Sequence, residues 1–194
     1  MELESAQMDL SPVRREILEA LLLHEKPVKA SQIAKETGKE QPAVQMHLIG
    51  LVKMKYAESP QKGQYVVTEK GKEALGLPEV TKETALRILA LTPSDRAFHF
   101  YGGIGKPLNL YAKNLLDFCD KISKINVDSV EFHFNRGDFE AWFKFLGDAE
   151  LAKKTELLKT KKVSGEELRG KILEITENRC RLLVKTAGQT GPQP

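Results

Sequence analysis

The stretch Ser31-Gln-Ile-Ala-Lys-Glu-Thr-Gly38 is followed by Lys39-Glu40 and by Gln41-Pro-Ala-Val-Gln-Met-His-Leu-Ile-Gly-Leu-Val-Lys-Met54. Ser31 is a candidate N-cap for a short helix, and Gly38 can take the left-handed conformation that ends it. Pro42 lies in the first turn of the next helix, where its missing N–H costs little. The apolar residues of that helix recur at the spacing of one buried face: Val44, Leu48, Leu51 and Val52. The sequence therefore predicts a helix-turn-helix whose second helix runs from Pro42 to Met54.

A β-hairpin is predicted directly after this helix. Residues 55–58 and 64–68 are short strand-like runs, and Ser59-Pro-Gln-Lys-Gly63 between them is typical of a turn. The segment Thr68-Glu-Lys-Gly-Lys-Glu-Ala-Leu75 then leaves the second strand and begins another helix. A hairpin in this place is predicted to lie beside the helix-turn-helix as a wing.

The residues before the helix-turn-helix predict a supporting helix. Ser11-Pro12 provides an N-cap and a first-turn proline, and the helix is expected to end before Lys26-Pro27. Charge also separates along this part of the chain: from Lys26 to Lys72 there are nine lysines and four glutamates, whereas residues 1–25 are mainly acidic. The predicted reading surface is therefore basic, and the acidic residues lie away from it.

The order of elements over residues 11–77, together with the Thr-Glu-Lys-Gly junction at 68–71, resembles the winged helix-turn-helix of MarR-like and ArsR-like DNA-binding regulators. The resemblance implies a domain that binds double-stranded DNA and places its second helix in the major groove. It covers somewhat over a third of the chain. We expect such a protein to act as a homodimer, because two reading units on adjacent half-sites raise affinity and specificity.

The predicted contacts with DNA follow from the buried face of the second helix. With Val44, Leu48 and Leu51 turned inward, glutamines on the outer side can pair with adenine, and Ala43 can contact a thymine methyl group. Lysines flanking the helix would hold phosphates, and the tip of the wing would enter a minor groove. The predicted DNA-binding residues are Lys39, Gln41, Ala43, Gln45, Met46, Ile49, Lys53, Gln61, Lys62 and Gln64.

Met46 and Ile49 stand where winged helices of this type often carry Arg or Lys. An apolar pair on the outer face also suits a protein contact. The alternative interpretation is therefore a winged-helix adaptor that binds a protein partner within a larger complex.

The second part of the chain is predicted to be helical. Gly76-Leu-Pro78 ends the first domain, residues 78–96 form a connector with a helix over 81–91, and residues 97–185 form a second domain. Apolar residues from Leu108 to Ile125 step by three or four, which predicts about five helical turns.

Further helices are expected after residue 125. Residues 126–134 suit either a strand or a helix, and we favour a helix. Asp138 is expected to cap a helix that buries Trp142, and Ser164-Gly-Glu-Glu167 matches a capping box at the start of a long final helix. The predicted fold is therefore mainly α. Residues 1–10 are expected to be flexible and residues 186–194 disordered.

The strings His133-Phe-Asn-Arg-Gly-Asp-Phe-Glu-Ala-Trp142 and Leu146-Gly-Asp-Ala-Glu-Leu-Ala152 resemble an archaeal and bacterial domain of unassigned function. The resemblance covers residues 97–183. It implies a compact, mainly helical module, and it implies no activity and no site.

Candidate catalytic groups have packing explanations. His99, His133, Asp138 and Glu140 could form a metal or acid/base cluster, but Asp138 stands where an N-cap is needed and Glu140 lies in a first helical turn. Gly102-Gly-Ile-Gly-Lys106 lacks the spacing of a phosphate-binding loop. We therefore expect no enzyme, no cofactor and no metal. The remaining alternative, an uncharacterised enzyme, would need a polar cleft around His133 and Asp138.

The composition fits a folded, water-soluble chain. It has 194 residues, 41% of them hydrophobic, and a formal net charge of +3. No stretch approaches 18 uninterrupted apolar residues, and Met-Glu-Leu-Glu-Ser5 lacks the features of a signal peptide. Cys119 and Cys180 are expected to be reduced thiols. We therefore expect a cytoplasmic protein without a membrane segment.

Overall fold

The computed structural model describes residues 10–188, which are mainly helical and divide into two compact units between Glu79 and Val80. The predicted flexibility of 1–9 and disorder of 189–194 fall outside the described residues. At the edges of the described range, Leu10 is buried and the last helix continues to Thr186.

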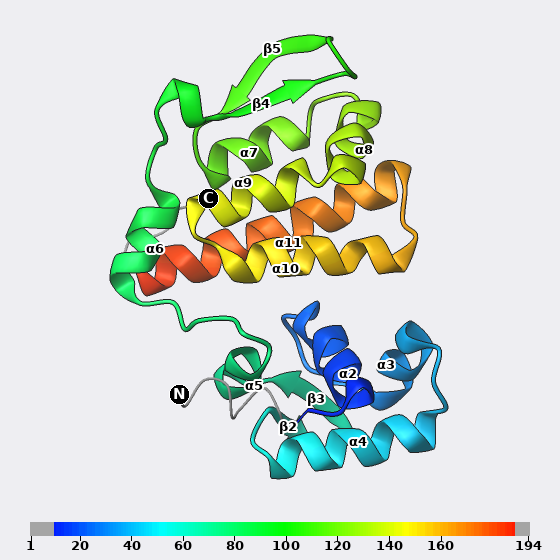
Figure 1. Ribbon diagram of the computed structural model, residues 1–194. Coiled ribbons are helices and arrows are strands. Elements are labelled where there is room, and N and C mark those ends of the chain that lie inside the picture. Colours follow the sequence, from blue (N-terminus) through cyan, green and yellow to red (C-terminus); the bar gives the residue numbers. More distant parts are fainter. Residues whose placement is uncertain (1–9, 189–194) are drawn as a thin grey trace. The chain divides into compact units, whose positions relative to one another are not determined.

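The first unit is a winged helix-turn-helix, as predicted (Figure 1). Its elements are α2 (Pro12–Leu22), β1 (Val28–Lys29), α3 (Ala30–Thr37), α4 (Gln41–Lys53), β2 (Ala57–Gln61), β3 (Gln64–Val67) and α5 (Glu69–Ala74). The three strands form an antiparallel sheet in the order β1-β3-β2, with Val28 opposite Tyr65 and Ala57 opposite Val67. The sheet and α3 both pack against α2 and α4.

The predicted local signals place these helices. The Ser11 hydroxyl accepts a hydrogen bond from the Arg14 N–H at 3.4 Å, and Pro12 occupies the first turn of α2. Gly38 ends α3 with a φ of +65°. The core joins the inner faces of the helices: Ile17, Leu18, Leu21, Ile33, Val44, Leu48 and Leu51 are all fully buried. Three of the four residues predicted for the buried face of α4 are therefore confirmed, and the fourth, Val52, is half-buried.

Two local predictions in this unit are wrong. Ser31 lies inside α3 and is not its N-cap. Val28–Lys29 pairs with β3, so that Lys29 is the N-cap and the helix begins at Ala30. The strand β2 continues through the segment predicted as a turn, and Gln61 opposite Gln64 leaves only Lys62 and Gly63 between the strands. Pro60 is compatible with this because β2 is an edge strand that need not donate at every position.

The base of this hairpin is fixed by the Thr68 to Gly71 junction. The Thr68 hydroxyl accepts from the Gly71 N–H at 3.1 Å and donates to the Lys55 carbonyl at 2.6 Å. A Cβ atom at Gly71 would lie 2.0 Å from the Tyr56 carbonyl oxygen. Only glycine therefore lets α5 approach the start of β2 so closely.

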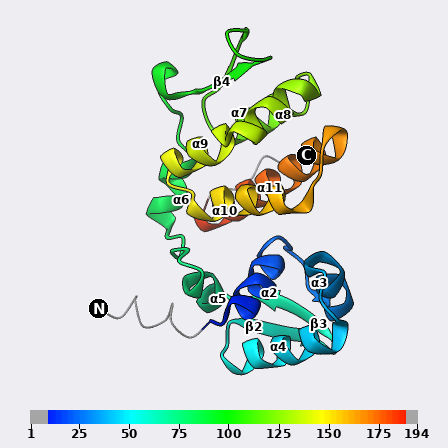
Figure 2. The same ribbon diagram turned by 45° about the vertical axis from the view of Figure 1, so that its right-hand side comes forward.

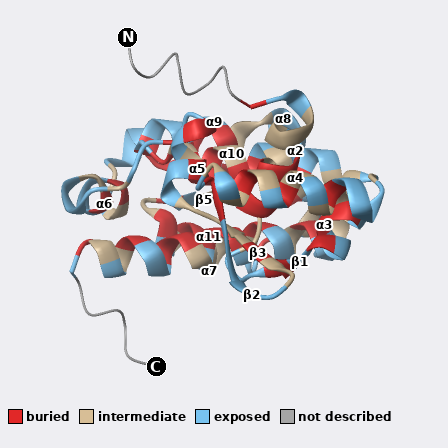
Figure 3. Ribbon diagram, turned by 90° about the horizontal axis from the view of Figure 1, so that it is seen from below, coloured by how far each residue is buried: buried red, intermediate tan, exposed pale blue. Residues whose placement is uncertain are grey.

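The second unit is a helical domain with one β-hairpin. Its elements are α6 (Lys82–Leu89), η1 (Ser94–Arg96), β4 (Phe98–Tyr101), β5 (Pro107–Ala112), α7 (Leu115–Ile122), α8 (Val127–Arg136), α9 (Asp138–Leu146), α10 (Ala149–Leu158), η2 (Lys159–Lys161) and α11 (Gly165–Thr186). The long helix α11 contacts α6, α7, α8 and α10, and Figures 1 and 2 show α10 and α11 side by side. Buried residues recur along α11 between exposed ones (Figure 3).

Aromatic rings form the centre of this unit. Phe118 stacks on Trp142 with ring centroids 5.6 Å apart, and Phe98 meets both rings edge-on. The Trp142 indole N–H donates to the Arg96 carbonyl at 3.2 Å, so this tryptophan belongs to the core, as predicted.

Charged side chains are also buried in this unit. Arg179 is 2% exposed and bonds Asp148 at 2.9 Å and Glu150 at 2.7 Å, while Asp148 also caps α10. Mutual pairing offsets the cost of burying these charges.

The predicted helix from Leu108 to Ile125 is wrong in its first part. Residues 107–112 form β5, which pairs with β4 so that Phe98 faces Ala112 and Phe100 faces Leu110. The apolar spacing suits a helix, but the backbone of β4 pairs with this segment as an antiparallel strand. The helix favoured for residues 126–134 is confirmed as α8.

Two predicted caps are also absent. Gly137, with a φ of +80°, is the N-cap of α9, and the Asp138 carboxylate bonds His133 instead of a backbone N–H. The Ser164 side chain makes no cap bond, and the first N–H of α11, that of Gly165, donates to Glu131 Oε1 at 2.6 Å. For Asp138, a bond to His133 takes the place of the predicted cap. The helix of the predicted connector, α6, contacts α11.

Candidate nucleic-acid interface

The outer face of α4 is the main candidate surface for binding nucleic acid. Five of the predicted residues on or beside it are exposed: Gln41, Ala43, Met46, Ile49 and Lys53. Met46 is 75% exposed and Ile49 44% exposed, which are large values for apolar side chains. Because Val44, Leu48 and Leu51 are fully buried, the helix turns one side into the core and presents the other to solvent.

Gln45 lies on the same helix but is held by the sheet. Its amide Nε2 donates to the Tyr65 hydroxyl at 2.6 Å, and the side chain is half-buried. Tyr65 is on β3, so this bond ties α4 to the wing. Sequence reasoning missed Tyr65, because only the tertiary fold brings a residue 20 positions downstream to Gln45.

The predicted phosphate-binding lysines differ in their surroundings. Lys39 Nζ lies 2.7 Å from a carboxylate oxygen of Glu16 on α2, so part of its charge is already compensated. Lys53, at the end of α4, and Lys62, in the hairpin turn, are exposed. Lys53 and Lys62 are therefore the more available cations on this surface.

The tip of the wing combines the remaining predicted residues. Gln61 and Lys62 are exposed, and Gln64 Nε2 donates to Gln61 Oε1 at 3.0 Å across the turn. Gly63 has a φ of +75°, a left-handed backbone conformation that glycine adopts readily. The structure thus places Gln61, Lys62 and Gln64 together at one end of the hairpin.

Arg14 is a positioning residue that the sequence did not reveal. Its guanidinium group lies against Gly50 of α4, 3.3 Å from where a Cβ would be, and Nη1 lies 3.8 Å from Met54 Sδ. The absence of a side chain at Gly50 lets α2 and α4 approach here. In the sequence, Arg14 is one of two adjacent arginines in a helix that also carries Glu16 and Glu19.

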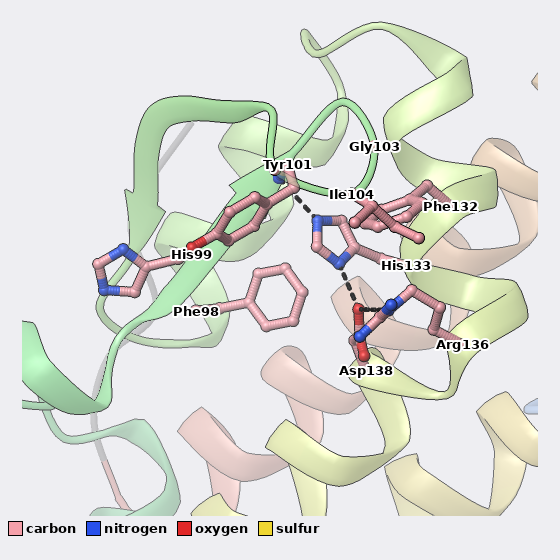
Figure 4. Close-up of a pocket in the computed structure, with 10 residues that line it drawn as sticks. Phe98, His99, Tyr101, Gly103, Ile104, Phe132, His133, Arg136 and Asp138 are labelled. Atoms are coloured by element: carbon pink, nitrogen blue, oxygen red, sulfur yellow. Dashed lines mark hydrogen bonds and ion pairs between the residues drawn. The ribbon is translucent and has the colours of Figure 1, made fainter.

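The second unit holds a pocket of about 420 Å³ between the β4–β5 hairpin and α8 (Figure 4). Three of the four residues considered above as a metal or acid/base cluster line it: His99, His133 and Asp138. Glu140 is separate from them, and its carboxylate pairs with Lys159 Nζ at 2.6 Å.

His133 uses both ring nitrogens for structural bonds. Nε2 accepts from the Tyr101 N–H at 2.8 Å, so Nδ1 carries the proton and donates to Asp138 Oδ2 at 2.7 Å. Burial and the nearby Arg136 lower the pKa of His133, although Asp138 opposes the shift. A neutral imidazole with no free nitrogen has no site left to accept a substrate proton.

The remaining reactive side chains have similar explanations. Cys119 and Cys180 are free thiols, and a hydrogen bond to Cys180 together with burial raises the pKa of Cys119. A raised pKa keeps the Cys119 thiol protonated, and a protonated thiol is a poor nucleophile and metal ligand. Across residues 10–188, His, Cys, Asp and Glu do not gather into a group that could hold a metal ion.

Comparison with known families separates the same two parts of the chain. Residues 11–59 match the model of the bacterial regulatory protein, arsR family, which covers α2 through the middle of β2. Residues 80–177, just over half of the chain, match the family of unknown function DUF5752. The chain belongs to the DUF5752 family. No curated protein and no solved structure matches it.

The DUF5752 region begins at residue 80, where the second compact unit also begins. It contains the β4–β5 hairpin, the aromatic core and the pocket around His133. The arsR-type helix-turn-helix points to a regulatory DNA-binding protein. Among the described residues, no helix combines the length and apolar character needed to cross a membrane.

Proposed function

We propose that this protein is a transcriptional regulator whose first unit reads duplex DNA. One observation carries the proposal: within an arsR-type helix-turn-helix, the outer face of α4 is exposed beside a hairpin with Lys62 at its turn. An exposed helix of this kind fits the major groove, and the adjacent hairpin reaches the neighbouring backbone or minor groove.

The exposed residues suggest how each contact would form. Gln41 and Ala43, near the start of α4, would meet base edges, and Gln41 can pair with adenine. Lys53 and Lys62 would neutralise phosphates at the two ends of the surface. Lys39 would contribute more weakly, because contact with DNA requires it to leave Glu16.

We assign Gln61, Lys62 and Gln64 to the flanking groove, and Gln45 to a restrained contact. The bond from Gln45 Nε2 to Tyr65 leaves its carbonyl oxygen as the group that can accept from a base. Met46 and Ile49 would meet thymine methyl groups or sugar carbons.

The DUF5752 unit would give the regulator its second property, oligomerisation or a response to a ligand or partner. A homodimer in the cytoplasm is the proposed working form, because paired reading units recognise two half-sites. The exposed Leu182 on α11 is a candidate for such a contact, at 38% exposure.

Fluorescence anisotropy of a labelled duplex, measured over a series of salt concentrations, tests DNA binding. We expect binding that weakens with salt, and a double variant Lys53→Ala/Lys62→Ala that lowers the magnitude of the log–log salt slope by about 2. The control is Lys171→Ala, which removes an exposed lysine of α11 and should leave the slope unchanged. Absence of binding at low salt, or a slope unaffected by the double variant, would overturn the proposal.

The exposure of Met46 and Ile49 favours one alternative, a protein-interaction adaptor. Met46→Lys separates the two functions, because a new cation on a DNA-facing helix should tighten duplex binding at low salt. On a protein-binding face the same lysine would have to be buried without a partner, and complex formation would be lost. Tighter DNA binding supports the regulator, and weaker or unchanged DNA binding supports the adaptor.

A further inference from the structure

The pocket of the DUF5752 unit has mostly aromatic and apolar walls. The rings of Phe98, Tyr101 and Phe132 all surround His133, with centroids 4.9, 6.2 and 5.1 Å from the imidazole. Figure 4 shows Ile104 near Phe132, at the tip of the loop that joins β4 to β5. Ile104 is 85% exposed although it lines the pocket, so it is an apolar contact that a bound molecule could cover. A volume of about 420 Å³ falls within the range of sites for small molecules.

Arg136 places a positive charge at this pocket, and two contacts hold its guanidinium group in position. Its Nε donates to Asp138 Oδ2 at 3.2 Å, and its guanidinium carbon lies 5.1 Å from the centroid of the Phe132 ring. Among the contacts within residues 10–188, the two terminal amino groups of Arg136 have no hydrogen-bond partner. The side chain is therefore oriented by Asp138 and Phe132, and its outer edge remains able to donate two parallel hydrogen bonds.

The other polar groups facing Arg136 in the pocket are His133 and Asp138, which bond to each other. The His133 nitrogens are both engaged, and the Asp138 carboxylate already accepts from His133 and Arg136. Lys106 adds positive charge beside the loop, because its side chain packs 3.7 Å from where a Cβ of Gly103 would lie. A ligand for this site needs an apolar body for the rings and a flat anion for Arg136.

From this arrangement we infer that the pocket binds a small aromatic carboxylate, with its ring against Phe98, Tyr101 and Phe132 and its carboxylate on the guanidinium group of Arg136. A carboxylate matches the planar fork of arginine with two parallel bonds, whereas a phosphate lacks the apolar body that the walls would bury. The inference goes beyond DNA binding. It is tested without DNA, so it stands or fails independently of the regulator proposal.

Trp142 makes the binding measurable on the full chain. It is the sole tryptophan of the sequence, and its ring lies 5.6 Å from Phe98, which lines the pocket. We use phenylacetate as the probe, phenylacetamide as its neutral counterpart of the same shape, and inorganic phosphate as an anion without a ring. The expected result is a saturable change in Trp142 fluorescence with phenylacetate, binding of phenylacetamide weaker by about tenfold, and no saturation with phosphate.

Variants then assign the contact to Arg136. Arg136→Gln should weaken phenylacetate about tenfold and leave phenylacetamide nearly unchanged, because only the charged ligand uses the guanidinium group. The matched control is Arg181→Gln, which removes an exposed arginine of α11 outside the pocket and should change neither ligand. Ile104→Asp, at a position too exposed to disturb the core, should weaken both ligands.

Several results would overturn the inference. They are the absence of saturable binding by phenylacetate, equal affinity for phenylacetate and phenylacetamide, and an Arg136→Gln variant that binds phenylacetate like the wild type. Equal binding of inorganic phosphate would show a general anion site and would likewise reject the proposed class of ligand.

Discussion

The two β-hairpins of this protein are held in different ways. In the first unit, β2–β3 has a third strand beside it, and its base is closed by Thr68 and by the backbone approach at Gly71. In the second unit, β4–β5 stands as a pair of strands with an irregular register near Tyr101. Its inner residues pack on the aromatic core. The end of β4 is joined to α8 by two hydrogen bonds, from the Tyr101 N–H to His133 and from the Ser129 hydroxyl to the Tyr101 carbonyl.

This difference separates a fixed surface from an adjustable one. A hairpin held by backbone contacts keeps a constant position beside α4, which suits a surface that must match the regular geometry of a duplex. A hairpin fastened in part by a titratable side chain, His133, can respond to pH or to a ligand beneath it. The comparison predicts a graded series of effects.

The largest effect is expected at the base of the first hairpin. Gly71→Ala would place a Cβ 2.0 Å from the Tyr56 carbonyl oxygen. This oxygen belongs to the backbone, which cannot move aside as easily as the end of a flexible side chain. We expect the first unit to lose about 3 kcal/mol or more of its free energy of unfolding. Hydrogen–deuterium exchange of α4 and β3 measures this loss, and Trp142 fluorescence should show the second unit unchanged. Protection of α4 and β3 equal to the wild type would contradict close packing at this junction.

A smaller loss is expected from the fastening of the second hairpin. His133→Leu leaves the Tyr101 N–H and the Asp138 carboxylate without their partner, which should cost about 1–3 kcal/mol. Urea unfolding followed by Trp142 fluorescence measures the cost. A variant as stable as the wild type would show that the hydrogen bonds of His133 do not stabilise the hairpin.

The same bond predicts a dependence on pH. Burial lowers the pKa of His133 below its usual 6.5, so the unfolded chain binds more protons than the folded chain in the acidic range. The stabilisation by neutral His133 is complete above pH 6.5 and is lost as the pH falls through the lowered pKa of the folded protein. Unfolding at about pH 8 and about pH 5 should show a larger acid loss in the wild type than in His133→Leu. Equal acid losses would mean that His133 does not titrate with folding.

The turns of the two hairpins should differ little. Gly63 and Gly105 have φ values of +75° and +70°, and a Cβ at either would meet no atom within 4 Å. Each Gly→Ala change should therefore cost about 1 kcal/mol through backbone conformation alone. Thermal unfolding of the two variants compares them. A much larger loss at one turn would reveal a packing constraint there and would weaken the view that only the anchors differ.

The smallest effect is expected where the first hairpin meets α4. Tyr65→Phe removes the acceptor of Gln45 Nε2 at the edge of a half-buried site, which should cost about 0.5 kcal/mol. Freed from Tyr65, Gln45 could offer both ends of its amide to a base, so preference among duplexes should shift while overall affinity changes little. Binding of a panel of duplexes by anisotropy measures both quantities. An unchanged preference would place Gln45 outside the reading surface.

The accuracy of the sequence predictions follows the range of the interactions. The winged helix-turn-helix was predictable because Ser11, Gly38, Pro42 and the Thr68 junction act on their own neighbours, and because α4 buries one regular face. Residues 107–112 were mispredicted because their apolar spacing suits a helix until β4 provides a partner. From the sequence, most of the predicted DNA-contacting residues could be assigned to α4 and the wing. The partners that some of them bind within the fold, such as Tyr65 for Gln45 and Glu16 for Lys39, could not be predicted.

By itself, the sequence determined the supporting helix, the helix-turn-helix and the wing of the first unit, and the burial of Trp142 on its helix. These follow from local capping and from the periodic burial of apolar side chains. Tertiary structure alone decided that Gln45 is bound to Tyr65, that Asp138 holds His133 instead of capping α9, and that Arg136 borders a pocket. Each of these depends on a polar side chain choosing among partners from different elements, and that choice is made only when the chain is folded.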